Sequence, residues 1–184
     1  TVSNYSVNPT TGALTPNGPP VVAADTTEIV VTPATGIATP YEGNRFALVI
    51  NNPSGAVTTK NIQVFSLDTE NGTLAPIASA VPGIGQDPGS AYEFYGLSPS
   101  GNLFFITNTT GSISVYRLDP LSGALTAVPG SPFAAGVNPR AIAVDPRGEF
   151  VYLGNSRASE GIMAFRVNPV TGALTPIAVS PYLA

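Results

Sequence analysis

Short apolar runs, each ended by Gly, Pro, Asp or Asn, follow one another along the whole chain. In its last part they are AIAVDP at 141–146, EFVYLGN at 149–155, GIMAFRV at 161–167 and ALTPIAVS at 173–180. Runs of this length that are rich in Val, Ile, Phe and Tyr predict β-strands, and the turn residues between them predict hairpins. We therefore expect one antiparallel meander of four strands, which we call a, b, c and d in chain order.

The same order of runs occurs twice more toward the N-terminus. The preceding unit has its runs at 94–99, 102–108, 112–118 and 124–130, and the unit before it at 28–33, 45–52, 61–67 and 73–79. In the earlier of these units the insert 34–43 enlarges the a–b turn, and the first part of the chain supplies only strands c and d, at 2–7 and 13–22. The predicted division is a half unit at 1–24 and whole units at 25–80, 81–131 and 132–184.

A near-identical segment marks the c–d turn of every unit. It reads TGALTPN at 11–17, NGTLAPI at 71–77, SGALTAV at 122–128 and TGALTPI at 171–177, with its glycine at Gly12, Gly72, Gly123 and Gly172. The Asn or Asp that opens each turn can bond the backbone that follows it, and the glycine can supply the left-handed residue that closes the hairpin. The turn is therefore a structural repeat rather than an active-site motif.

A four-stranded meander repeated at this spacing predicts an all-β protein built of β-propeller blades. A sandwich or a solenoid is the alternative, but neither explains four strands per unit with the same turn each time. Strand c carries an aromatic residue at one position of every unit, which we expect to pack between neighbouring sheets: Tyr5, Phe65, Tyr116 and Phe165.

The composition excludes several kinds of catalytic and metal-binding residue. The chain has no Cys and no His, which excludes disulfides, thiolate nucleophiles and imidazole bases or metal ligands. Only 10% of the residues are charged, Lys60 is the single lysine, and the net charge is −4, so we expect no nucleic-acid partner. We also expect no cofactor, no bound metal and no membrane span. The low charge favours an extracytoplasmic or secreted protein, and the start at Thr1 without Met favours a processed product or a piece of a longer chain.

Three segments resemble the lactonase-type seven-bladed propellers, the family that includes a 6-phosphogluconolactonase. They are NPRAIAVDPRGEFVYLGN at 138–155, SVYRLDPLSGALT at 114–126 and GSPF at 130–133, and the resemblance extends over nearly the entire chain. It implies a propeller fold, of which the repeats found here make about three and a half blades and thus an incomplete ring. The rest of the ring is then expected from a longer parent chain or from partner subunits.

The candidate binding edge is the one opposite the c–d turns. In an antiparallel meander the start of strand a, the end of strand b and the b–c loops share one edge, and the b–c loops of this chain differ in length, which is typical of a binding face. The candidates are Thr27, Glu93 and Arg140 near the start of strand a, Asn52, Asn108 and Asn155 at the end of strand b, and Lys60, Arg157 and Glu160 in the b–c loops.

Each candidate also has a purely structural interpretation. The asparagines can cap strands in left-handed turn conformations, and Arg140 can pair with Glu93 across neighbouring units. Two arginines beside the strand c aromatic, Arg117 and Arg166, are expected to be solvated or to contact the next unit. Asp119 and Asp145 precede prolines and are expected to form turns.

Two hypotheses about function follow. The first, which the missing His and Cys and the low charge favour, is a non-catalytic exported module for protein binding, structure or self-assembly. The second, which the resemblance implies, is a sugar-lactone hydrolase in which Glu93 acts as the base and Arg140, with Arg157, anchors the substrate. A cycloisomerase of the same fold is a further alternative, but the missing His makes its base harder to supply. A small sugar or a protein is the expected ligand.

Overall fold

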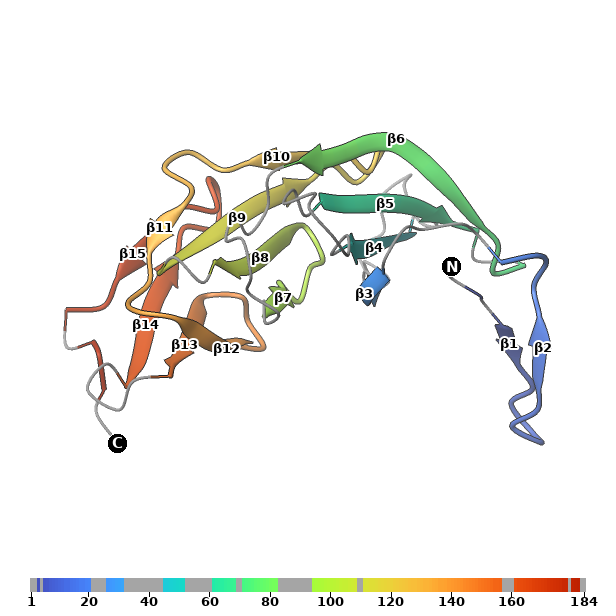
Figure 1. The fold of residues 1–184 in the computed structure, drawn as a ribbon, viewed down its shortest axis with the longest axis horizontal. Helices are drawn as coiled ribbons and strands as arrows, with labels where there is room; N and C mark the ends of the chain where they lie inside the picture. Colours follow the sequence, from blue (N-terminus) through green and yellow to red (C-terminus); the bar gives the residue numbers. More distant parts are fainter. Residues whose placement is uncertain are drawn as a thin grey trace, which may run out of the picture. The chain divides into compact units, whose positions relative to one another are not determined.

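The computed structural model describes residues 3, 5–20, 26–31, 45–51, 61–68, 71–82, 94–108, 111–156, 161–178 and 180–182. Every regular element within these ranges is a β-strand (Figure 1). The strands are β1 (Tyr5–Val7), β2 (Leu14–Pro16), β3 (Thr26–Val31), β4 (Arg45–Asn51), β5 (Asn61–Leu67), β6 (Leu74–Pro82), β7 (Tyr95–Leu97), β8 (Leu103–Asn108), β9 (Ser112–Leu118), β10 (Leu125–Ala127), β11 (Phe133–Ala134), β12 (Pro139–Val144), β13 (Phe150–Asn155), β14 (Ile162–Val167) and β15 (Leu174–Pro176).

The strands form antiparallel sheets in which chain neighbours pair. Strands β1 and β2 form a hairpin, β3 to β6 and β12 to β15 form four-stranded sheets, and β7 to β10 form a third meander to which β11 adds. The pairing of chain neighbours confirms the predicted antiparallel meanders, whereas the bounds of the half unit and of the three units stay a prediction. The insert 34–43 lies outside the described residues.

In the repeat unit at 81–131, strand d differs from the single strand expected at 124–130. Strand β10 ends at Ala127, and β11 resumes the pairing with β9 at Phe133. At the interruption the backbone N–H of Val115 donates to Ser131 Oγ at 2.9 Å. The last unit repeats this arrangement, with the N–H of Ala164 donating to Ser180 Oγ at 3.0 Å.

The chain divides into two compact units. The first comprises Thr1–Gly83 with the turn Pro120–Ala124, and the second comprises Ile84–Asp119 with Leu125–Ala184. In the first unit Ala47, Val49 and Phe65 form a buried cluster on the sheet β3–β6. Because alternate residues of a strand face opposite sides of its sheet, these apolar runs supply buried side chains to both faces, as the burial of the neighbouring Leu48 also shows.

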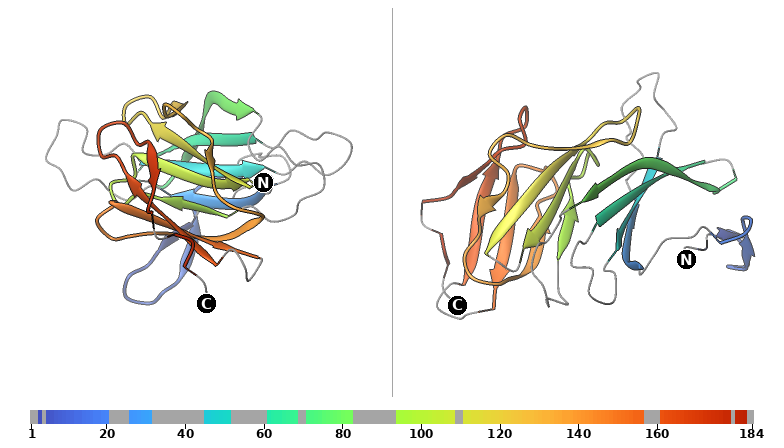
Figure 2. Two further views of the ribbon diagram at one scale, coloured as in Figure 1. Left: turned by 90° about the vertical axis from the view of Figure 1, so that its left-hand side faces the viewer. Right: turned by 45° about the horizontal axis from the view of Figure 1, so that its top comes forward.

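The core of the second unit lies between the sheets β7–β10 and β12–β15, which lie side by side in Figures 1 and 2. The larger buried side chains at this interface are Leu103, Phe105, Ile113 and Val115 from the first sheet and Val151, Leu153, Phe165 and Val167 from the second. Burying an aliphatic or Phe side chain contributes about 1.5–3 kcal/mol. Face-to-face packing of these two meanders is therefore the main source of stability of this unit.

The strand c aromatics confirm the packing prediction in two units and contradict it in another. Phe65 and Phe165 are fully buried, and Tyr116 is half-buried, where burial raises the pKa of its hydroxyl. Tyr5 is 49% exposed, so the expectation that it packs between sheets is wrong for the hairpin β1–β2 as described.

The c–d turns have the predicted chemistry. Asn8 Oδ1 accepts the N–H groups of Thr10 and Thr11 at 2.9 and 3.0 Å, and Asn168 does the same for the two residues at the equivalent positions. The four turn glycines all have positive φ, between 70° and 77°. That backbone conformation is strained for residues with a Cβ, which explains why glycine recurs there.

Candidate functional site

Asn108 ends strand β8 and is paired in register with Ser112 of β9. Its side chain is 7% exposed, and its Nδ2 donates to Ser112 Oγ at 2.8 Å and to Ser114 Oγ at 2.9 Å. Its Oδ1 is buried and accepts no hydrogen bond from the described residues. The amide is therefore held by its nitrogen, while its oxygen still requires a donor.

The strand end next to Asn108 is held by the start of strand a. The backbone N–H of Phe94 donates to Thr107 Oγ1 at 2.9 Å, and the Thr107 hydroxyl donates back to Phe94 O at 3.2 Å. Thr107 is 1% exposed, so these bonds are shielded from water. They fix the position from which Asn108 projects.

Asn155 occupies the same place at the end of β13. It is paired in register with Pro139, and its backbone N–H donates to Gly161 O at 3.0 Å. Both polar atoms of its side chain are buried, and neither has a hydrogen-bond partner in the described ranges. A buried amide without a partner costs about 1–3 kcal/mol. Among the described polar groups at this edge, Asn155 thus has two buried atoms available to a ligand or solvent partner.

Arg140 lies at the start of strand a, directly after Pro139, which is the register partner of Asn155. It is exposed, and the pairing of β12 with β13 shifts register between Pro139 and Ala141 on either side of it. Thr27 occupies a matching register shift between Thr26 and Glu28 in β3, which supports the alignment of these positions. A register shift of this kind interrupts the regular pairing of the two strands at the edge of the sheet.

The expected left-handed conformation is wrong for both strand-ending asparagines that the structure describes. Among the described non-glycine residues only Asn138 has positive φ, at 56°. Asn108 and Asn155 instead remain in extended pairing with Ser112 and Pro139, because each still belongs to its strand ladder. The left-handed residue is the one that leads into strand a.

The structure adds polar residues that the sequence interpretation did not select. Ser112 and Ser114 bind Asn108, and Asn138 Nδ2 donates to Ser156 Oγ at 3.1 Å. The alternation of Ser112 and Ser114 in an otherwise apolar strand was the available signal, since alternate residues share one face.

Several predicted site residues lie outside the described residues: Asn52, Lys60, Glu93, Arg157 and Glu160. Thr27 is described through its backbone pairing alone. Their part in a site stays a prediction, as does the pairing of Glu93 with Arg140. Among the residues that are described, the structure brings Asn155 and Arg140 to one end of the sheet β12–β15 and Asn108 to the corresponding end of β7–β10.

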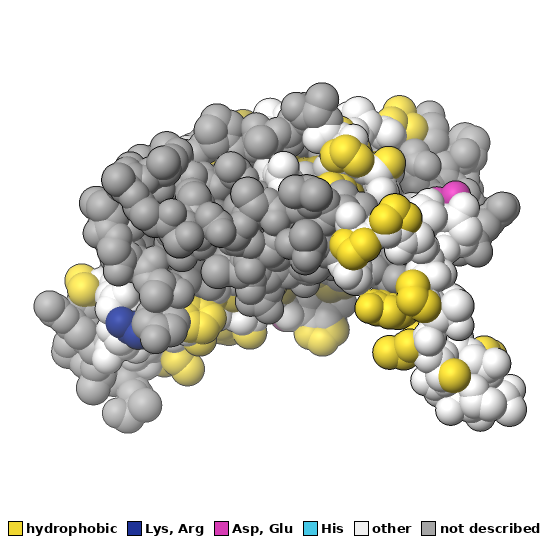
Figure 3. All heavy atoms as spheres, turned by 45° about the vertical axis from the view of Figure 1, so that its right-hand side comes forward, with side chains coloured by type: hydrophobic (Ala, Val, Ile, Leu, Met, Phe, Trp, Pro, Cys, Tyr) yellow, Lys and Arg dark blue, Asp and Glu magenta, His cyan; other side chains and the backbone are white. Residues whose placement is uncertain are grey.

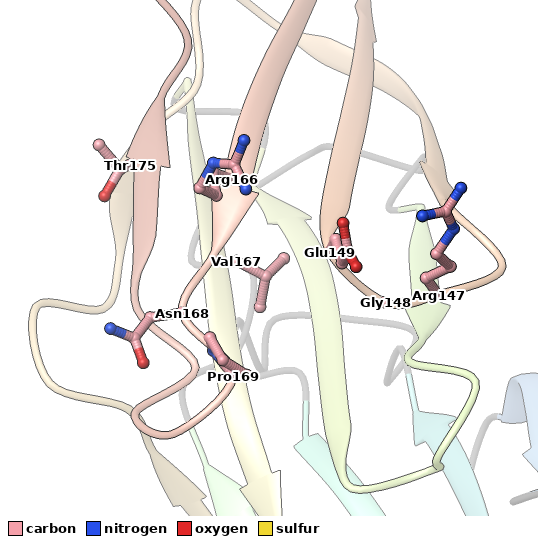
Figure 4. A pocket seen from close by; sticks show the side chains of 8 residues that line it. All are labelled: Arg147, Gly148, Glu149, Arg166, Val167, Asn168, Pro169 and Thr175. Atoms are coloured by element: carbon pink, nitrogen blue, oxygen red, sulfur yellow. The ribbon is translucent and has the colours of Figure 1, made fainter.

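A pocket of about 550 Å³ lies at the opposite edge of the last sheet (Figure 4). Arg147, Glu149 and Arg166 provide its charged groups, and the carboxylate of Glu149 stands between the two guanidinium groups in this view. Beside it, Asp145 forms the predicted turn: the hydrogen bond from the Phe150 N–H to Asp145 Oδ1, at 2.8 Å, is the main cause that lowers the pKa of this carboxyl.

No group of three or more acidic side chains among the described residues is arranged to hold a metal ion. The described part of the chain likewise contains no helix of the length and apolarity that crossing a membrane requires.

Comparison with solved structures shows the fold. A candidate 6-phosphogluconolactonase from Bacteroides uniformis is 21% identical with a TM-score of 0.69, over 98% of this chain and 48% of that one. A protein of unknown function from Desulfotomaculum acetoxidans is 18% identical with a TM-score of 0.64, over 95% and 47%. A candidate 6-phosphogluconolactonase from Bacteroides fragilis is 16% identical with a TM-score of 0.54, over 98% and 64%. The chain therefore spans about half the length of the first two of these structures.

Comparison of the sequence shows the family. None of the curated proteins matches it. The sequence model of the family described as "Lactonase, 7-bladed beta-propeller" matches residues 59–183, which is more than half of the chain. Together with the repeated antiparallel meanders, this match shows that the chain belongs to the lactonase family of seven-bladed β-propellers.

Proposed function

We propose that the chain takes part in hydrolysis of a sugar lactone, and that the substrate binds at the edge where the b strands end. The family match supports this hypothesis more directly than it supports a non-catalytic module. The observation that carries the choice of edge is Asn155, whose two buried amide atoms have no partner among the described residues. A polyhydroxylated ring offers both donors and acceptors to such a group.

The neutral groups at this edge suit the substrate class. Asn108 and Asn155 present amide atoms, and the hydroxyls of Ser112 and Ser114 lie within hydrogen-bond distance of Asn108. Sugar hydroxyls are recognised by such uncharged donors and acceptors, whereas Arg140 adds a positive charge suited to a substrate carboxylate or phosphate.

Hydrolysis requires a base that removes a proton from the attacking water. The chain has no His, and we assign this step to the carboxylate of Glu93, which immediately precedes strand a of its unit. The water oxygen attacks the lactone carbonyl, the ring C–O bond breaks, and the proton passes to the departing alkoxide. A cation at Arg140 would stabilise the negative charge that develops on the carbonyl oxygen.

The test is the rate of gluconolactone hydrolysis, with and without a 6-phosphate, measured by acid release against the uncatalysed rate. We expect Glu93→Gln to lower kcat/KM by about 100-fold or more. Asn155→Ala should lower it by about 10-fold, chiefly through KM, because it removes a hydrogen-bonding group.

Matched controls lie at the opposite edge of the last sheet. Arg147→Ala should leave the rate unchanged where Arg140→Ala reduces it, and Asn168→Ala controls for Asn155→Ala. Hydrolysis no faster than in buffer would instead favour the non-catalytic module. Equal kcat/KM for the parent and all site variants would remove the residue assignments.

A further inference from the structure

The asparagine at the end of strand b is held by two serines in one sheet and by no described residue in the next. In the sheet β7–β10 the Nδ2 of Asn108 donates to the hydroxyls of Ser112 and Ser114, at 2.8 and 2.9 Å. In the sheet β12–β15 neither amide atom of Asn155 has a partner among the described residues. The same residue at the equivalent strand end therefore has different hydrogen-bonding neighbours in the two sheets.

The neighbours that differ lie on strand c. In the sheet β7–β10 the asparagine is paired with Ser112. In the sheet β12–β15 the backbone N–H of the asparagine donates to Gly161 O at 3.0 Å, which places Gly161 opposite it. Ser114 and Met163 each follow two residues later, and alternate residues of a strand share one face of the sheet. Glycine and methionine thus occupy the two positions from which serines hold the amide in the preceding sheet.

Neither of these two residues can replace the serine hydroxyls. Met163 is the register partner of the fully buried Leu153, and its side chain packs against the core of this unit. A thioether is only a weak acceptor and donates nothing, and Gly161 has no side chain at all. The amide of Asn155 therefore keeps both its donor and its acceptor open, at the edge of an apolar surface where unmade hydrogen bonds are costly.

An open amide of this kind favours a particular ligand chemistry. Charged residues make up only 10% of the chain, and on the described part of the face in Figure 3 hydrophobic and uncharged groups predominate over the charged ones. A carboxamide with both atoms free presents an acceptor and a donor side by side. Two neighbouring hydroxyls of a sugar ring match this pair, because one can donate to Oδ1 while the other accepts from Nδ2. The amide of Asn108, whose nitrogen is already engaged, offers only its oxygen.

We propose that Asn155 selects ligands that carry two neighbouring free hydroxyls, and that Met163 and Gly161 permit this by leaving both atoms of the amide open. Asn155 contacts the ligand, whereas Met163 and Gly161 act only through Asn155. The lactone identity of the ligand comes from the proposed function, on which this inference rests, and the paired hydroxyls are the added requirement. A lactone without hydroxyls, such as δ-valerolactone, gains nothing from Asn155.

Two variants at one position test the proposal while Asn155 stays in place. Met163→Ser supplies the hydroxyl that Ser114 gives to Asn108, and Met163→Ala shortens the side chain equally without a hydroxyl. We expect KM for gluconolactone to be about tenfold higher in Met163→Ser than in Met163→Ala, at equal kcat, because Nδ2 is then occupied. KM for δ-valerolactone should be equal in the two variants. Gly161 stays unchanged because its φ of 45° would strain a residue with a Cβ.

Binding without hydrolysis supplies a second measurement. The cyclic ether anhydroglucitol has the ring and the hydroxyls of gluconolactone but no carbonyl, so it cannot be hydrolysed. Its dissociation constant, from NMR titration, should again be about tenfold higher for Met163→Ser than for Met163→Ala. Asn155→Ala, which leaves Met163 in the core, should raise it by a similar factor over the parent. Tetrahydropyran, the same ring without hydroxyls, is the control ligand.

The outcomes separate this proposal from the proposed function. If anhydroglucitol binds with the expected pattern while no lactone is hydrolysed, the lactonase assignment fails and the selection by Asn155 is supported. If lactones are hydrolysed but the two Met163 variants have equal KM and equal dissociation constants, the selection is overturned and the lactonase assignment remains. A parent that does not bind anhydroglucitol, or an Asn155→Ala variant that binds it as the parent does, would show that only water meets this amide and would overturn the proposal.

Discussion

The packing of the last c–d turn predicts a specific cost for a single methyl group at Gly172. Its φ is +77°, and a Cβ there would lie 2.8 Å from Leu103 Cδ2 and 2.9 Å from Val128 Cγ1. Both distances are shorter than ordinary carbon contacts, and both neighbours are buried core side chains. Gly172→Ala therefore forces either the turn or the core to move.

The magnitude has two sources that a matched variant separates. A left-handed conformation costs a residue with a Cβ about 1–2 kcal/mol, and overpacking a core costs about 1–3 kcal/mol, so Gly172→Ala should destabilise the chain by about 2–5 kcal/mol. Gly12 has nearly the same φ, +70°, but no described neighbour within 4 Å. Gly12→Ala should therefore cost only the conformational part, about 1–2 kcal/mol.

Equilibrium unfolding in urea measures both changes. The chain has no Trp, so tyrosine fluorescence and far-UV circular dichroism are the suitable signals. The change in free energy of unfolding follows from the shift of the midpoint at constant m-value.

The comparison can refute the reasoning directly. If Gly172→Ala costs no more than Gly12→Ala, the turn is not packed against Leu103 and Val128. A changed m-value for Gly172→Ala alone would show that the substitution alters the compactness of one of the states rather than the packing of the turn.

Three further predictions concern side chains that form hydrogen bonds with the backbone. Arg117→Ala should lower the free energy of unfolding in urea by about 1 kcal/mol, because it removes the hydrogen bond to Val170 O. Arg117→Lys should not fully restore this stability. An unchanged free energy of unfolding for Arg117→Ala would show that the bond does not hold the turn in place. Thr107→Val, which keeps the shape of a buried side chain, should cost about 1–3 kcal/mol in the same assay, and a neutral result would show that its two bonds are not shielded from water. The lowered pKa of Asp145 stabilises the fold above the ordinary carboxyl pKa, and this contribution is lost as the pH falls through the folded value. The urea midpoint should therefore decrease less between about pH 6 and about pH 3 for Asp145→Asn than for the parent, whereas parallel slopes would contradict the assignment.

Much of the fold could be read from the sequence because its determinants are local. The turn Asn8–Gly12 and its counterpart at 168–172 form the same hydrogen bonds and the same positive φ, since an Asn side chain and a glycine act within a few residues of chain. Strand order within each meander follows from the short connections, which favour antiparallel neighbours.

The candidate site was less accessible to sequence reasoning. The choice of edge followed from strand direction, and it correctly placed Asn108 and Asn155 at the ends of their strands. Their conformation was predicted wrongly, because an asparagine before a loop resembles a turn residue whether or not it still belongs to the strand ladder. The part of Ser112 and Ser114 was missed, since it depends on which face of the sheet an asparagine side chain points to.

Tyr5 and Phe165 show what cannot be predicted from the sequence alone. Both precede nearly identical turns in nearly identical hairpins, yet one is 49% exposed and the other is fully buried. The sequence by itself determined the repeat, the strands and the turns, because these depend on backbone preferences and bonds within a few residues. Only the tertiary structure decided which copy of the hairpin is covered, which arginine reaches a turn carbonyl and which amides lack partners, because burial depends on residues far away in the chain.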